Sequence, residues 1–135
     1  MSSVPEYKKE FDAWNAIKQR LDTVRPSYFY EREVWWSHVG VNVGVEIDGK
    51  GTYFVRPVVV VKKFNKHSFL GLPVTLQNKT GKYHVPIHFE NGLQRIVITS
   101  QLRLFDSCRL YKKYGTVSAG SFLEMKKAIR DFFEI

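Results

Sequence analysis

The sequence predicts an α+β fold in which a small antiparallel β-barrel is flanked by an N-terminal helix and a C-terminal helix. Short strand-like runs follow one another between turn residues, as in small barrels. Four consecutive valines lie within one of these runs, Phe54–Phe64. The dipeptide Asn91-Gly92, between two other runs, is the strongest short hairpin signal in the chain. These observations indicate one barrel domain with one core.

The run Phe54–Phe64, which reads FVRPVVVVKKF, predicts the central strand of the barrel. β-Branched valines fit a pleated surface, and the lack of alternation predicts apolar cover on both faces. Because Pro57 has no N–H to donate, we expect regular strand pairing to begin after it. Arg56 then stands as a fixed positive charge at the mouth of a buried strand.

Residues 5–24 predict one amphipathic helix that begins near Pro5 and ends before Pro26. Its apolar residues recur every three or four positions and form one stripe: Tyr7, Phe11, Trp14, Ile17, Leu21 and Val24. Charges of both signs fill the opposite side almost equally, which disfavours a membrane-binding helix. We expect residues 1–31 to form a helical extension packed on the barrel domain of residues 32–135, within one chain or across two copies.

The remaining elements follow from alternating hydrophobicity and from turn residues. A first strand is expected at Glu33–Val41, followed by a long loop at Asn42–Tyr53. Further strands are expected at Phe69–Gln77, Tyr83–Phe89, Leu93–Thr99 and Gln101–Leu110, the last with a turn after it. Thr116 or Ser118 caps a last helix over Ala119–Phe133.

Composition limits the class of protein and of partner. The chain has 135 residues, 44% of them hydrophobic, enough for one core without disulfides or metal. Cys108 is its single cysteine, which excludes an internal disulfide and a thiolate cluster. The N-terminus is polar, and no apolar run reaches the roughly 18 residues of a membrane span. We therefore expect a cytoplasmic protein with no membrane association.

The net charge of +8 is unevenly distributed. Residues 1–32 carry six Lys and Arg against five Asp and Glu, so nearly all of the positive excess lies on the expected barrel and the last helix. Such a field suits a polyanion, an anionic membrane surface or an acidic protein. Charge alone does not choose among them.

Most signatures of cofactor or metal chemistry are absent. The chain has no phosphate-binding Gly-Lys-Ser/Thr loop, no dinucleotide fingerprint and no nucleophile elbow. His84 and His88 share one face of an expected strand but lie about 13 Å apart along it, too far for one ion. We therefore expect neither a cofactor nor a metal.

A set of polar groups nevertheless suits a phosphodiester. Arg56 stands at the start of the central strand, and Thr75 lies on the polar face of the next strand. Arginine binds a phosphate with two parallel hydrogen bonds and keeps its charge as negative charge builds in a transition state. The glycine-rich loop, at about twelve residues, exceeds the usual hairpin length and can close over a phosphate chain. It carries three charged side chains: Glu46, Asp48 and Lys50.

Four sequence blocks stand in order ahead of the terminal helix: EVWWSHVGVNVGVE, RPVVVV, LPVT and SQLRLFDSCRL. Their order and approximate spacing over residues 32–133 resemble the PemK/MazF family of toxin endoribonucleases of type II toxin–antitoxin systems. The resemblance implies an SH3-like barrel, a homodimer, a cognate antitoxin and metal-independent cleavage of single-stranded RNA.

The resemblance also implies roles for individual residues. Arg56 matches the family's arginine before Pro-Val, and Thr75 matches its threonine after the third strand; in the family both contact the scissile phosphate. We predict Arg56 and Thr75 as catalytic residues. RNA contacts are predicted from five further side chains: Glu46, Asp48, Lys50, Gln77 and His84.

The implied reaction is attack of the RNA's 2′-hydroxyl on the adjacent phosphate, which leaves a 2′,3′-cyclic phosphate and a 5′-hydroxyl. Arginine is a poor base, because its pKa is above about 12, so Glu46 and His84 are the candidate bases.

A non-catalytic module that binds RNA or protein is the alternative function. It is suggested by Leu76, where the family commonly has serine, and by Ile98 and Ser100, where some members have an arginine and an acid. A toxin that acts on a protein target rests on analogy of fold alone.

Overall fold

The computed structural model describes Ala13 and residues 28–39, 55–78 and 80–134. The elements in this part of the chain are β1 (Glu33–His38), β2 (Val55–Asn65), β3 (Ser68–Thr75), β4 (His84–His88), β5 (Gln94–Ile98), η1 (Thr99–Gln101), β6 (Arg103–Asp106), η2 (Ser107–Arg109), β7 (Leu110–Thr116) and α2 (Ala119–Phe133). The predicted N-terminal helix, including Trp14 of its stripe, lies outside the described residues, apart from Ala13.

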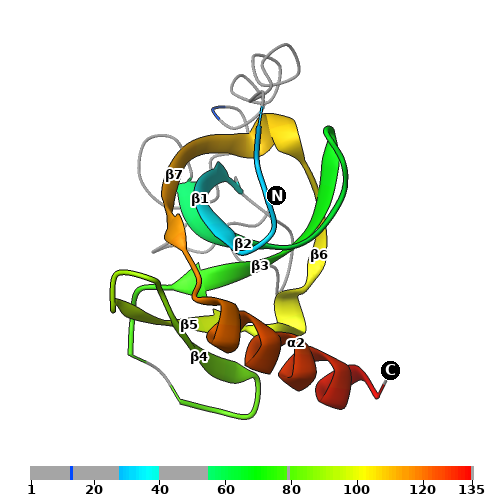
Figure 1. The fold of residues 1–135 in the computed structure, drawn as a ribbon. Helices are drawn as coiled ribbons and strands as arrows, with labels where there is room; N and C mark the ends of the chain where they lie inside the picture. The colour runs from blue at the N-terminus through cyan, green and yellow to red at the C-terminus, as the bar shows by residue number, and fades with distance from the viewer. Residues whose placement is uncertain (1–12, 14–27, 40–54, 79, 135) are drawn as a thin grey trace, which may run out of the picture.

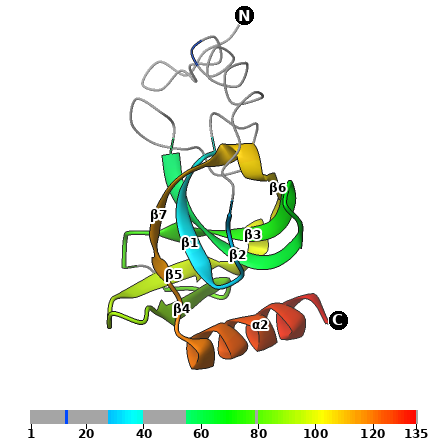
Figure 2. The same cartoon turned by 45° about the horizontal axis from the view of Figure 1, so that its top comes forward.

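The strands form one antiparallel sheet that curls into a small barrel (Figure 1). Its neighbour order is β4-β5-β3-β2-β1-β7, and β6 also pairs with β3. β3 therefore lies at the junction of the sheet, because it pairs with β2 along one edge and with β6 and β5 along the other. Turning the molecule shows α2 beneath the β4–β5 hairpin (Figure 2). The predicted antiparallel barrel with a C-terminal helix is confirmed.

β2 is the central strand that its valines predict. Val58, Val59, Val60 and Val61 are all buried, and they alternate between two hydrophobic clusters on opposite faces of the strand. This explains the absence of alternation in the sequence. The expectation for Pro57 is only half correct. Pairing with β3 begins at Val58, but pairing with β1 already runs through Pro57, because a missing N–H removes one bond without ending the strand.

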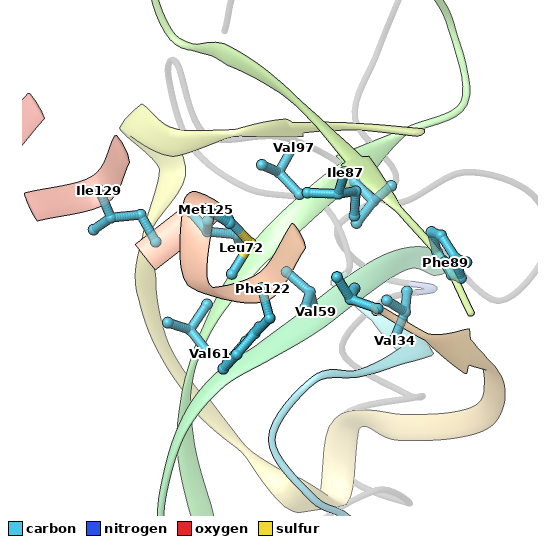
Figure 3. Close-up of a cluster of buried hydrophobic side chains, with 12 residues drawn as sticks. Val34, Val59, Val61, Leu72, Ile87, Phe89, Val97, Phe122, Met125 and Ile129 are labelled. Atoms are coloured by element: carbon cyan, nitrogen blue, oxygen red, sulfur yellow. The ribbon is translucent and has the colours of Figure 1, made fainter. Parts of the chain in front are cut away.

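One cluster, which we call the helix core, lies between the sheet and α2 (Figure 3). Phe122, Met125 and Ile129 of α2 pack there on β-strand side chains that include Val59 and Leu72. The other cluster, which we call the barrel core, lies inside the curled strands. Its residues are Phe29, Val39, Val58, Val60, Phe69, Phe105 and Leu110. Each core needs one face of β2, so the same strand holds both together.

α2 begins and ends where the sequence predicts, and Ser118 is its N-cap. The Ser118 hydroxyl accepts a hydrogen bond from the backbone N–H of Ser121 at 3.3 Å. We expect Ser118→Ala to lower the free energy of unfolding by about 1 kcal/mol, since one helical N–H loses its acceptor. The denaturant midpoint followed by circular dichroism measures this loss.

The matched control is Ser100→Ala, because Ser100 is exposed and the structure gives its side chain no hydrogen bond within the described residues. We expect this control to change stability by no more than about 0.5 kcal/mol, as is usual for such surface positions. If the two variants lose equal stability, the Ser118 cap contributes nothing.

β7 is a strand that the sequence analysis missed. The expected strand Gln101–Leu110 with a turn after it is only partly correct, because β6 covers Arg103–Asp106 alone and η2 follows it. In place of the expected turn, the residues LYKKYGT pair with β1 at the edge of the sheet. The register between β1 and β7 shifts twice, so side chains of β7 do not alternate regularly between inside and outside. Exposed Lys112 and Lys113 suit this position, because lysines on an edge strand discourage pairing with another chain.

Two strands that flank the candidate site end earlier than expected. β3 ends at Thr75 rather than Gln77, and β1 ends at His38, three residues before the expected Val41, which lies outside the described part.

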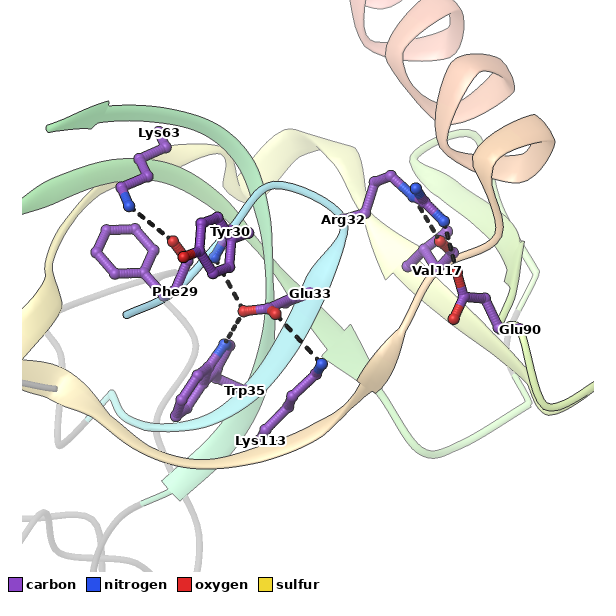
Figure 4. Close-up of polar contacts among 9 residues, drawn as sticks. All are labelled: Phe29, Tyr30, Arg32, Glu33, Trp35, Lys63, Glu90, Lys113 and Val117. Atoms are coloured by element: carbon purple, nitrogen blue, oxygen red, sulfur yellow. Dashed lines mark hydrogen bonds and ion pairs between the residues drawn. The ribbon is translucent and has the colours of Figure 1, made fainter. Parts of the chain in front are cut away.

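A polar network anchors β1 between its neighbours. Figure 4 shows the Glu33 carboxylate accepting hydrogen bonds from Tyr30 N at 2.9 Å and Trp35 Nε1 at 3.0 Å. The same carboxylate lies 3.2 Å from Lys113 Nζ of β7.

Candidate active site

Arg56 lies near the start of β2, half-buried and opposite Ser37 of β1. The last pair of this ladder is His38 with Val55, so the chain leaves β1 and returns to β2 beside Arg56. The segment between these strands carries Glu46, Asp48 and Lys50, which lie outside the described residues. His38 and Val55, which lie at the two ends of this segment's flanking strands, are therefore both close to Arg56.

Thr75 is the last residue of β3, the strand next to β2 (Figure 1). The final pair between these strands is Val58 with Pro73. Arg56 comes two residues before Val58, and Thr75 comes two residues after Pro73, so the register brings both to the same edge of the barrel. Because successive side chains alternate between faces, both belong to the face of Val58. The two residues predicted as catalytic therefore share one edge and one face.

The Thr75 side chain is almost fully buried, with 4% of its surface exposed. Its Oγ1 accepts a hydrogen bond from the backbone N–H of Gln77 at 3.1 Å, which fixes the position of the oxygen. A hydroxyl that accepts one bond still has a hydrogen to donate. Within the described residues that hydrogen has no acceptor, so Thr75 can donate to an anion.

A pocket of about 280 Å³ opens beside Thr75, between the end of β3 and the start of β5. Its lining residues are Thr75, Leu76, Gln77, Asn78, Gln94, Arg95 and Ile96. Gln77, predicted to contact RNA, is thus placed next to Thr75. The lining holds one cation, three side-chain amides and no acid, so the pocket suits an anionic, hydrogen-bonding ligand.

His84 stands at the start of β4, and β5 separates it from Thr75. Thr75 pairs with Ile96, whereas His84 pairs with Ile98, so two strand spacings of about 10 Å in total separate the two strands. His84 does not line the pocket. Its Nδ1 atom is buried without a hydrogen-bond partner in the described part of the chain. The RNA contact proposed for His84 stays a prediction.

Arg109 fastens the end of β1, where the segment with Glu46 begins. Its Nη1 donates to the carbonyl oxygens of His38 at 3.0 Å and Val39 at 3.4 Å. Burial, followed by the positive charge of Arg103, lowers the pKa of Arg109 from its ordinary value. The block SQLRLFDSCRL therefore contributes at least one structural arginine near the site.

Gln94 and Arg95 are lining residues that the sequence analysis did not identify. Both lie in the expected strand Leu93–Thr99, for which the sequence predicts no site residue. The alternation of residues along this strand marks Arg95 as unusual, because it occupies the same face as apolar Leu93 and Val97. A charged residue on the face that is predicted to be buried indicates either that the predicted strand is wrong or that the residue has a function.

Two further observations concern metal and membrane. In the described ranges, no three His, Cys, Asp or Glu side chains come close enough together to hold a metal ion. None of the helices described there has the length and apolar character needed to cross a membrane.

One comparison with known proteins shows the family of this chain. The family model described as PemK-like, MazF-like toxin of type II toxin-antitoxin system matches residues 31–133. No curated protein matches the chain in sequence. The solved structures that resemble it are distant in sequence, so they show the fold alone.

Three such structures illustrate the likeness. MazF from Deinococcus radiodurans is 17% identical with a TM-score of 0.63, over 83% of this chain and 99% of that one. An endoribonuclease in complex with its cognate antitoxin, from Mycobacterial species, is 12% identical with a TM-score of 0.59, over 80% and 97%. The MazE–MazF complex from D. radiodurans is 15% identical with a TM-score of 0.54, over 83% and 98%.

Proposed function

Because the chain belongs to the PemK-like, MazF-like toxin family of type II toxin–antitoxin systems, we propose that it is a toxin endoribonuclease that cuts single-stranded RNA in the cytoplasm. The observation that carries this proposal is the strand register. Extended by two residues beyond its last pair, Val58 with Pro73, this register supports the proposal, because Arg56 and Thr75 then lie on one face at one end of the barrel.

In the proposed reaction the 2′-oxygen of the RNA forms a bond to the adjacent phosphorus, and the bond from phosphorus to the 5′-oxygen breaks. A base removes the 2′-hydroxyl proton, and the departing 5′-oxygen takes a proton from the solvent. Arg56 stabilises the negative charge that builds on the phosphate oxygens, because its guanidinium stays charged throughout. The Thr75 hydroxyl, held by Gln77 N, donates to one of those oxygens and orients the phosphate. Glu46 and His84 are the candidate bases.

We expect cleavage to proceed equally in EDTA and in Mg²⁺, because the nucleophile belongs to the substrate and Arg56 supplies the positive charge. The measurement is incubation of the purified protein with a long unstructured RNA, followed by analysis of the product ends. Cleavage that requires Mg²⁺, or products with 5′-phosphates, would contradict the mechanism. The Arg56→Ala protein, purified in the same way, is the control for contaminating ribonuclease.

Two partners belong to the proposal. We propose a cognate antitoxin, which is supported by the family and by the solved complex of a similar endoribonuclease with its antitoxin. We also propose a homodimer, on the resemblance of the sequence to the family.

A non-catalytic RNA-binding module is the second candidate, and one observation favours it. Leu76 follows Thr75 directly and is 52% exposed at the pocket, where the family commonly has serine. If the protein binds RNA tightly but leaves it intact in both EDTA and Mg²⁺, this second function is the correct one.

A further inference from the structure

We propose that the pocket beside Thr75 is a subsite for one nucleotide of the RNA, in which Arg95 binds a backbone phosphate and Leu76 supports the base. This inference rests on the proposed function and extends it by naming a second cation for the substrate. It applies whether the RNA is cut or only bound.

Arg95 makes one hydrogen bond in the described part of the chain, although its guanidinium carries five N–H donors. It is half-buried on β5 opposite Ile87, a residue with no exposed surface. One bond is formed, from Nη1 to the carbonyl oxygen of Gln94 at 2.9 Å. The Nε atom is buried and has no hydrogen-bond partner among the described residues, nor does a carboxylate pair with Arg95 there. Burying a charged group with an unpaired donor is unfavourable, so an anion beside it would stabilise the protein.

The position of Arg95 makes a phosphate of RNA the natural anion. Thr75 pairs with Ile96, the next residue along β5, so Arg95 and Thr75 lie on adjoining strands. Their side chains start on opposite faces of the sheet, and both residues line the pocket at the end of β3 and the start of β5. A change of rotamer that turns the guanidinium into this pocket would offer a phosphate two parallel N–H groups. The phosphate next to the scissile one would then be held by Arg95 while Arg56 and Thr75 hold the scissile phosphate.

The rest of the lining suits a base better than a free phosphate ion. Leu76 exposes more than half of its surface at the pocket and provides an apolar contact for the face of a base. Gln77, Asn78 and Gln94 add amides, which carry both donors and acceptors and can bond the edges of an unstacked base.

The test is the binding of a fluorescein-labelled single-stranded 2′-fluoro RNA, which cannot react, measured by anisotropy between 50 and 300 mM salt. We expect Arg95→Gln to weaken binding about tenfold, the effect of losing one charge-assisted bond. The slope of log affinity against log salt should fall by about 0.7, the value for one phosphate of a single strand. Arg95→Lys should keep the slope but recover the affinity only in part, since it lacks the fork.

The matched control is Arg130→Gln, which removes the same charge from the exposed face of α2, outside the pocket. It should change affinity less than twofold and leave the salt slope unaltered. Arg95→Gln should change the unfolding midpoint little, because it removes only one exposed hydrogen bond, from Nη1 to the carbonyl oxygen of Gln94, and an Nε that makes no bond among the described residues. If Arg95→Gln binds RNA no more weakly than Arg130→Gln, the subsite is overturned.

Leu76→Glu gives an independent test in case Arg95→Gln does not fold, because Leu76 is exposed and its replacement leaves the core intact. An acid in the pocket should repel a phosphate and weaken binding at low salt, whereas unchanged affinity would overturn the subsite.

Different results would overturn the proposed function and the proposed subsite. A wild-type protein that neither binds nor cuts RNA overturns both, while Arg56-dependent cleavage with normal binding by Arg95→Gln and Leu76→Glu overturns the subsite alone.

Discussion

Arg56→Ala lowers the single-turnover rate of RNA cleavage by about 10²-fold or more, the scale seen when one preorganised electrostatic donor is lost. Arg56 stands at the edge of the barrel beside Pro57 and the buried valines, so the substitution alters the site more than the fold. Affinity for a 2′-fluoro RNA should fall far less, because other basic residues still bind the backbone. The measurement is single-turnover cleavage at saturating enzyme, with binding measured separately.

Three variants sharpen this result. Thr75→Ala should slow cleavage in the same way but less, because a neutral hydroxyl contributes less than a charged donor. Arg56→Lys should not restore the full rate, since an ammonium lacks the planar fork of guanidinium. Arg130→Ala removes an exposed arginine from α2 and should cleave at the wild-type rate. Wild-type cleavage by Arg56→Ala would refute the assignment of the site and favour the RNA-binding module.

Phe69→Ala is the substitution with the largest expected effect on the fold, a loss of about 3–5 kcal/mol in the free energy of unfolding. Phe69 has no exposed surface and lies at the centre of the barrel core. Its ring stacks on Phe105 at 5.4 Å between centroids and is tilted against Phe29 at 5.3 Å. Truncation removes both contacts and leaves a cavity. The free energy of unfolding of a domain is only about 5–15 kcal/mol, so this loss would remove a large part of the stability of the fold.

The control for Phe69→Ala is Leu104→Ala, on the strand paired with β3. Leu104 is 60% exposed, so little apolar burial is lost and the change should stay within about 0.5 kcal/mol. Equilibrium unfolding in urea, followed by tryptophan fluorescence, gives both values. If the two variants unfold at the same midpoint, the barrel core does not stabilise the fold as the structure indicates.

The elements that the sequence predicts well are those in which local pattern and burial agree. The four valines of β2 predict a strand covered on both faces, and the structure confirms it with two separate cores. A cap at Thr116 or Ser118 and the spacing of Phe122, Met125 and Ile129 predict the last helix, and α2 has the predicted bounds with Ser118 as its N-cap. In each case the signal lies within a few adjacent residues, so no distant contact is needed to interpret it.

β7 shows where local pattern fails. Two register shifts against β1 remove the alternation by which a strand is recognised, and the neighbouring lysines suggest a solvent-exposed turn. Only β1, far away in the sequence, makes this stretch a strand. Pro57 was misjudged for a related reason, because a residue without an N–H can still hold its place in a ladder whose other bonds are formed.

The sequence by itself determined the central strand, the last helix and the identities of Arg56 and Thr75 as candidates for a phosphodiester site, because each rests on residue types and short spacings. Only the tertiary structure decided what surrounds those two residues. The register of β2 with β3 brings Arg56 to the edge and face of Thr75, and the pairing of β3 with β5 adds the pocket and Arg95. Strand register is set by the packing of two cores at once, and no local pattern contains that information.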